Sequence, residues 1–244
     1  MKITNSQSNT SIAEISDGIY RISTPVPPNP ALPDGFSFNQ FLIVDDEPLL
    51  FHTGLRGMFP LVREAIEAVI PVSTLRYLGI SHFEADECGA LNEFLEVAPR
   101  AVPLCSAVAK MVSVDDVADR EALGLGDGEQ LSLGKHTVGW IDTPHLPHGW
   151  DCGYLFEQKT STLFCGDLFT QPGAEHPPLT EGDILGPSEA MRGGMDYYAH
   201  TLKTADLIAK LAANEPTTLA CMHGSSWSGK GSNLLGELAV SLNS

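Results

Sequence analysis

Residues 81–87 read Ser81-His82-Phe83-Glu84-Ala85-Asp86-Glu87 and follow a short apolar segment, 76–80, that is predicted to form a strand. In an extended backbone, His82 and Glu84 point to the same side. Asp86 then lies at the start of a predicted helix, 86–97, where a carboxylate also suits an N-cap. Three carboxylates this close repel one another, and a pair of bound cations would neutralise them. The stretch therefore indicates a metal site; the alternative is a capped loop with solvated acidic side chains.

Three later segments carry residues of the same types where a predicted strand ends. Residues 142–151 follow an apolar strand and contain His145 and His148, Asp167 closes an apolar strand, and His223 follows the predicted strand 217–222. An ionised aspartate in an apolar setting needs a partner, and a shared metal ion is one. Each residue alone could be a satisfied histidine or a capping aspartate. Because functional groups at the ends of several strands converge at one rim of a sheet, we expect these segments to meet residues 82–87.

The charge balance excludes several classes of protein. The chain has 244 residues, with 14 Lys and Arg against 31 Asp and Glu, for a formal net charge of −17. This composition excludes a nucleic-acid binder and a protein that docks on an anionic membrane. No secretory signal and no membrane-spanning apolar stretch is expected. The five scattered cysteines form no Cys-x-x-Cys pair, which fits a reduced protein of the cytoplasm.

The pattern along the chain predicts one domain over residues 1–244, with a loose N-terminus at 1–10 and strands that lead into helices in both halves. Predicted strands lie at 11–24 (a hairpin), 38–44, 48–52, 76–80, 101–104, 137–142, 153–157, 162–166 and 217–222. Predicted helices lie at 59–70, 86–97, 105–113, 189–213 and 228–241. The proline-rich segment 171–188 is predicted to be a lid-like loop.

Taken together, these motifs resemble those of the metallo-β-lactamase superfamily over residues 12–240. The residues that carry the resemblance are His82-x-Glu84-x-Asp86, His148, Asp167 and His223-Gly224, supported by residues 18–22 and by Phe51-His52-Thr53-Gly54, where the superfamily usually has Asp-Thr-Gly. Glu84 narrows the resemblance to the di-iron branch, because zinc hydrolases usually carry a second histidine there. That branch comprises the catalytic domain of flavodiiron proteins and stand-alone oxygen-binding di-iron proteins. The implied fold is an α/β (α+β), four-layer αββα sandwich.

The resemblance also implies a ligand set for two iron ions. His82, Glu84 and His148 would hold the first ion, Asp86 and His223 the second, and Asp167 would bridge them. A site rich in carboxylates suits iron or manganese better than zinc. Iron is expected, and manganese and zinc remain alternatives. Open positions between the ions would take O2, peroxide or hydroxide.

Two positions depart from the pattern or leave a choice open. Glu87 stands where the family usually has histidine. It could bind the second ion, contact a ligand residue without binding the ion itself, or face solvent as an acidic residue at a helix N-terminus. His148 is preferred to His145 as the metal ligand because Asp151 follows it in a His-x-x-Asp pattern. His145 would then either contact a ligand residue without binding metal itself or line the pocket. Asp151 could orient a ligand histidine or cap a turn.

These features support two hypotheses for the function. The first is a di-iron protein that binds or reduces O2 or a related small oxidant. Flavodiiron proteins carry a flavodoxin domain after the metal domain, whereas this sequence stops at Ser244. We therefore expect no flavin in this chain and a separate protein as the electron donor. A homodimer is a further possible assembly. The second is a hydrolase of an ester, thioester or phosphoester that uses a metal-bound hydroxide. A degenerate metal site with a structural or partner-binding role is a third option.

Overall fold

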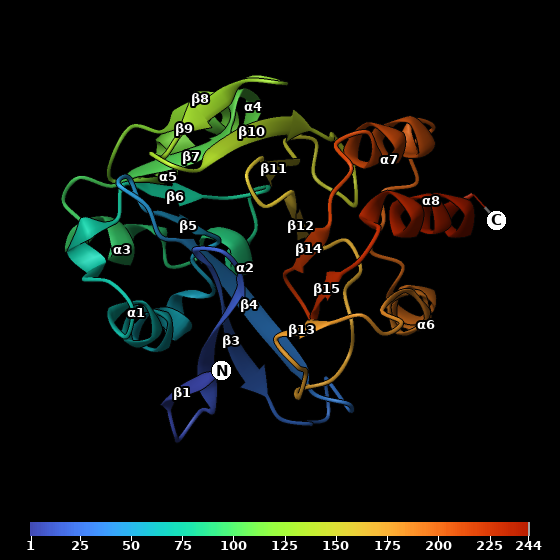
Figure 1. Cartoon of the computed structure of the whole chain (residues 1–244), viewed down its shortest axis with the longest axis horizontal. Helices are drawn as coiled ribbons and strands as arrows, with labels where there is room; N and C mark the ends of the chain where they lie inside the picture. Colours follow the sequence, from blue (N-terminus) through green and yellow to red (C-terminus); the bar gives the residue numbers. More distant parts are fainter. Residues whose placement is uncertain (244) are drawn as a thin grey trace.

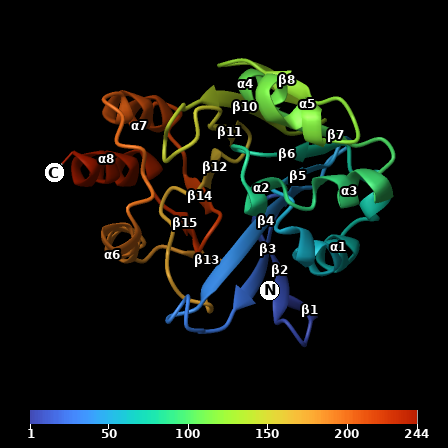
Figure 2. The same cartoon turned by 180° about the vertical axis from the view of Figure 1, so that it is seen from behind.

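Two β-sheets lie face to face in the middle of the molecule, and helices cover the outer face of each (Figure 1). The computed structural model describes residues 1–243. Helices α1 (Phe59–Glu67) and α3 (Leu91–Val97) lie on one side, and α6 (Leu185–Met195), α7 (Thr204–Ala212) and α8 (Gly231–Leu242) lie on the other, as the reverse view also shows (Figure 2). The layers confirm the predicted four-layer αββα sandwich.

The first sheet has the strand order β1-β2-β3-β4-β5-β6-β7-β8, antiparallel from β1 to β5 and parallel from β5 to β8. Its strands are β1 (Lys2–Asn5), β2 (Thr10–Ser16), β3 (Ile19–Val26), β4 (Phe36–Ile43), β5 (Leu49–Phe51), β6 (Tyr77–Gly79), β7 (Val102–Ser106) and β8 (Leu123–Leu125). The remaining helices, α2 (Ala85–Cys88), α4 (Ala107–Ala109) and α5 (Asp115–Val117), are short, and a π-helical turn (Lys110–Val114) joins the last two.

The second sheet has the order β13-β15-β14-β12-β11-β10-β9. Its strands are β9 (Gln130–Ser132), β10 (Thr137–Asp142), β11 (Gly153–Glu157), β12 (Thr162–Gly166), β13 (Leu179–Thr180), β14 (Thr218–Cys221) and β15 (Ser226–Ser228). The parallel neighbours β12 and β14 lead to candidate ligands at the same edge of the sheet: Asp167 directly follows β12, and His223 lies two residues after the end of β14.

Apolar side chains fill three spaces between the layers, because successive residues of a strand point to opposite faces. On β4, Phe41 and Ile43 enter the core between the sheets, while Leu42 between them packs with the residues under α1 and α3. On β12, Phe164 faces the inter-sheet core and Leu163 packs under α7 and α8. Both faces of each sheet are thus buried, which explains the nearly continuous apolar runs in these strands.

Three details of the sequence prediction are wrong. The N-terminus at 1–10 is not loose, because β1 pairs with β2 at the edge of the first sheet. The predicted helix 86–97 is divided into α2 and α3 at Gly89, where a Cβ atom would lie 2.3 Å from the carbonyl oxygen of Ala85. The predicted helix 189–213 is divided after Met195, where Asp196 takes a left-handed conformation with φ of 45°.

The second break has a tertiary cause. Residues 196–203 leave the helical path and bond to the loop between β10 and β11, where the backbone N–H of Ala199 donates to Pro147 at 2.7 Å. Leu202, which the helical pattern placed on the buried face, is consequently fully exposed. Within the described chain, no helix combines the length and apolar character needed to cross a membrane.

Candidate metal centre

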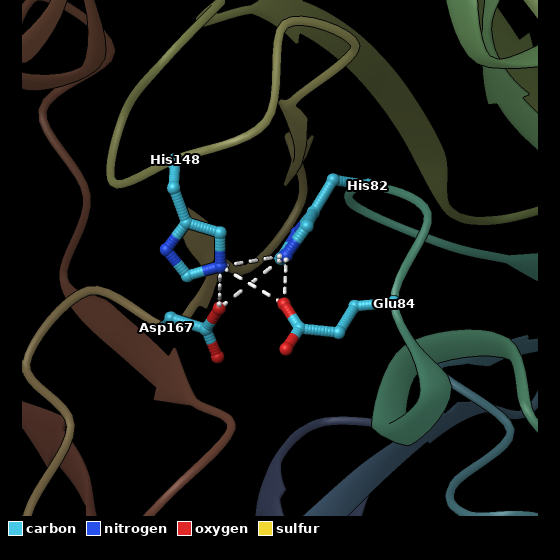
Figure 3. A group of neighbouring side chains, drawn as sticks. All are labelled: His82, Glu84, His148 and Asp167. Atoms are coloured by element: carbon cyan, nitrogen blue, oxygen red, sulfur yellow. Dashed lines mark hydrogen bonds and ion pairs between the residues drawn. The ribbon is translucent and has the colours of Figure 1, made fainter. Parts of the chain in front are cut away.

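Four side chains from three separate segments point their polar atoms at one spot (Figure 3). Glu84 Oε2 lies 3.0 Å from the Nε2 atoms of both His82 and His148, and these two nitrogens are 3.1 Å apart. Asp167 Oδ2 closes the group at 3.4 Å from His148 Nε2 and 3.6 Å from His82 Nε2. Ligand atoms that each bind one ion at about 2.1 Å are separated by roughly 3 to 3.5 Å. The spacing of the four atoms therefore fits an ion at their centre.

A second group begins at the other oxygen of the same aspartate. Asp167 Oδ1 lies 3.3 Å from His223 Nε2, and Asp86 Oδ2 lies 3.4 Å from that nitrogen. Asp167 is buried, and its two oxygens face two different sets of donors. A carboxylate in this position can bridge two ions, which in two-metal sites are about 3.5–4 Å apart.

Glu87 supplies the clearest test of whether a cation fits here. Its side chain is 0% exposed, and neither carboxyl oxygen has a hydrogen-bond partner among residues 1–243. Oε1 lies 3.9 Å from His82 Nε2. Burial, followed by the charge of Asp167, raises the pKa of Glu87 well above its ordinary value. A buried carboxyl group without a partner is costly, and a nearby cation would remove that cost. The donor set of this chain therefore fits metal ions.

The backbone fixes which nitrogen of two histidines faces the centre. His148 Nδ1 donates to the carbonyl oxygen of Tyr197 at 2.8 Å, and His223 Nδ1 donates to that of Ser37 at 2.8 Å. With the proton on Nδ1, the lone pair of Nε2 is available to a metal ion. The ring of Phe36 lies 4.3 Å from that of His223 and limits its rotation.

In the metal-free protein, attraction between the carboxylates and the histidines determines the pKa values of the centre. Burial alone would raise the pKa of Asp167, but the bond to His223 and the charge of His82 lower it to about 2. Burial alone would lower the pKa of His223, but its bonds to Asp167 and Asp86 raise it to about 9. Bonds from His148 and His82 lower the pKa of Glu84. Protons on the histidines thus balance the carboxylates, and metal ions would take over that role.

A family model described as ODP family beta lactamase matches residues 36–224. The chain belongs to the ODP family. Diflavin flavoprotein A 1 of Synechocystis sp. is 26% identical over 141 residues, which are 57% of this chain and 24% of that protein. The nitric oxide reductase of Moorella thermoacetica is 27% identical over 203 residues, 79% of this chain and 50% of that protein.

Solved structures share the fold of this ODP-family chain. The rubredoxin oxygen:oxidoreductase of Desulfovibrio gigas has a TM-score of 0.78 at 24% identity, over 95% of this chain and 60% of that chain. The flavodiiron core from Synechocystis sp. has a TM-score of 0.79 at 20% identity, over 96% of this chain and 61% of that chain. The predicted resemblance to the di-iron branch is confirmed. The chain spans between a quarter and a half of the length of the two curated relatives named above.

The structure separates the two histidines between which the sequence left a choice. His148 lies in the first group, whereas His145 is exposed, has a left-handed backbone with φ of 67°, and donates its backbone N–H to Gly149. Asp151 is buried, and its Oδ2 accepts the backbone N–H of Phe83 at 2.9 Å. Asp151 therefore fixes the loop that carries His82 and Glu84 in this ODP-family chain.

Other residues that shape the centre were missed by the sequence analysis. Tyr197 holds His148 through its carbonyl oxygen, and its hydroxyl lies 3.4 Å from the carbonyl oxygen of Asp167. Ser37 holds His223 from β4, in the other sheet. These contacts use backbone atoms across 49 and 186 residues of chain, so no local motif announces them.

Proposed function

We propose that the centre holds two iron ions and that the protein is an oxidoreductase that reduces O2. The observation that carries the proposal is Asp167, whose two buried oxygens face two separate groups of donors. Membership of the ODP family and the resemblance to flavodiiron cores support it. The name of the Desulfovibrio gigas neighbour describes an oxygen oxidoreductase, and that of the Moorella relative a nitric oxide reductase.

The proposed ligands divide between the ions as follows. His82, Glu84 and His148 hold the first ion; Asp86, Glu87 and His223 hold the second; and Asp167 bridges both. Carboxylate oxygens outnumber imidazole nitrogens in this set, which favours iron or manganese over zinc. Glu87 joins the set because its buried oxygens have no hydrogen bond to any residue that the structure describes.

Iron in this centre would supply the electrons that reduce O2. The residues around it control access and geometry. Asp167, Glu87 and His223 are buried and keep bulk water away from the second group. Glu84 has a side chain that is 51% exposed, so the first group of donors is open to solvent at this residue. We propose that a separate protein delivers the electrons.

A metal-dependent hydrolase is the second candidate. The family model carries the description beta lactamase, and a hydroxide held between two cations could attack an ester, thioester or phosphoester. Glu84 weighs against it, because this carboxylate replaces a softer imidazole ligand and adds negative charge where a hydroxide has to form.

The experiment compares iron-, manganese- and zinc-loaded protein in one set of assays. O2 consumption is measured with an electrode after chemical reduction, nitric oxide is tested in parallel, and a panel of esters, thioesters and phosphoesters is screened. We expect O2 consumption by the iron form and its loss in Asp167→Ala. Zinc-dependent ester turnover with no consumption of O2 by the iron form would contradict the proposal.

A further inference from the structure

His82 differs from the other two histidines of the centre in what holds its second nitrogen. His148 and His223 donate to backbone carbonyl oxygens, whereas His82 Nδ1 lies 3.1 Å from the hydroxyl of Ser81. The Ser81 hydroxyl also lies 3.0 Å from Nε2 of His52, at the end of β5. The buried side chains of His82, Ser81 and His52 thus form one chain of hydrogen bonds that leads from the centre into the core.

His52 occupies its place at a local cost. Its backbone is left-handed, with φ of 67°, a conformation that a non-glycine residue seldom adopts. Its ring is fully buried, and Nδ1 has no hydrogen-bond partner among the described residues. Strain and an unpaired polar atom at one residue point to a role that outweighs them. The hydrogen bond to Ser81 is the polar contact that the ring makes.

We propose that Ser81 and His52 form a neutral hydrogen-bond relay that positions His82 as a metal ligand. In it, His82 Nδ1–H donates to Ser81 Oγ, and the Ser81 hydroxyl donates to His52 Nε2. This inference rests on the proposed function, because it takes His82 Nε2 as the atom that binds metal.

The direction of the relay follows from counting protons. A serine hydroxyl has one proton to donate, and a neutral imidazole has one donor and one acceptor nitrogen. The reverse direction would put the proton of His82 on Nε2, which faces Glu84 and His148, where an ion has to bind. Burial lowers the pKa of His52 to about 3, so its ring stays neutral and can accept.

The thiol of Cys152, which donates to the carbonyl oxygen of Leu146 at 3.1 Å, also interacts with the His82 ring. It contributes to the raised pKa of His82, although burial of that ring acts in the opposite direction. A thiol is a weak donor and acceptor, so the Ser81 hydroxyl dominates the orientation of the ring. His52, the inner residue of this relay, occupies the position where the superfamily pattern usually has the aspartate of Asp-Thr-Gly.

The test uses zinc as a diamagnetic probe. Zinc affinity is measured by competition with a chromophoric chelator, and the protonated nitrogen of His82 is read from long-range ¹H–¹⁵N correlation spectra of the zinc-loaded protein. We expect the proton on Nδ1 in the wild type. Ser81→Ala should lower zinc affinity by about 10–100-fold, as loss of a partner behind a metal ligand typically does. Ser81→Thr, which keeps the hydroxyl, should restore affinity.

Two further variants complete the design. His52→Asn tolerates a left-handed backbone and should give an affinity between those of the wild type and Ser81→Ala. Ser226→Ala removes a buried hydroxyl that has no partner and should bind zinc like the wild type. Circular dichroism verifies that each variant is folded.

The outcomes separate the relay from the proposed function. Wild-type affinity and an unchanged Nδ1 proton in Ser81→Ala, with zinc binding abolished by Asp167→Ala, would overturn the relay alone. Wild-type affinity in His52→Asn would overturn the part assigned to His52. If Asp167→Ala also binds zinc like the wild type, both the metal centre and the relay are wrong.

Discussion

Replacing Glu87 by methionine should stabilise the metal-free protein and weaken its binding of metal. Within the described part of the chain, both carboxyl oxygens of Glu87 are buried without a hydrogen-bond partner, and leaving one such group unsatisfied costs about 1–3 kcal/mol. A flexible apolar side chain of similar length removes that cost. We therefore expect the free energy of unfolding of Glu87→Met, without metal, to exceed that of the wild type by about 1–3 kcal/mol.

The pH dependence of this difference has a definite sign. The pKa of Glu87 is raised in the folded protein, so its contribution to stability is complete below its unfolded pKa and declines as the pH rises towards the folded pKa. Methionine does not titrate. The advantage of Glu87→Met should therefore increase as the pH rises above the ordinary pKa of a glutamate.

The assay is urea unfolding followed by circular dichroism, with a chelator and then with added ferrous iron under anaerobic conditions. Glu87→Gln is the matched control, because it keeps two buried polar atoms and should gain little stability. Iron should stabilise the wild type more than either variant, since both lose a ligand. A Glu87→Met protein that is less stable without metal and binds iron as before would refute the role assigned to Glu87.

Three further expectations concern other parts of the molecule. The metal-free protein should lose stability as the pH rises from 6.5 to about 9, because Asp167 and Asp86 raise the pKa of His223 to about 9 against the effect of burial. That pKa shift corresponds to at most about 3 kcal/mol of stability. Unfolding measured at several pH values should show this loss without metal and no such loss with metal bound. His148→Asn should lower the metal content found by mass spectrometry, whereas His145→Asn should leave it unchanged. Leu202→Glu should change the free energy of unfolding by less than about 0.5 kcal/mol, because the side chain is fully exposed; a large loss would mean that it is buried.

The local sequence pattern was sufficient to predict the bounds of strands that are buried on both faces. Strands β11 and β12 have the predicted bounds, since their apolar runs are limited by turn residues on both sides. The four-layer architecture was implied by the resemblance to the metallo-β-lactamase superfamily, and the structure has it.

Contacts that distant segments make through backbone atoms could not be predicted. The helical pattern of 189–213 is real in spacing, but the segment around Tyr197 bonds to the loop that carries His148 and breaks the helix. The sequence also left Asp151 between two roles, and its bond to the backbone of Phe83 is visible only in three dimensions. In each case the deciding partner is a backbone atom, which any residue type supplies.

The central claim is that side chains from position 82 to position 223 hold two iron ions bridged by Asp167. Anomalous diffraction at the iron edge from crystals of iron-loaded protein tests it most directly. We expect two peaks, one beside Glu84 and His148 and one beside Asp86 and His223. A map without density between these side chains, from crystals shown to contain iron, would contradict the account.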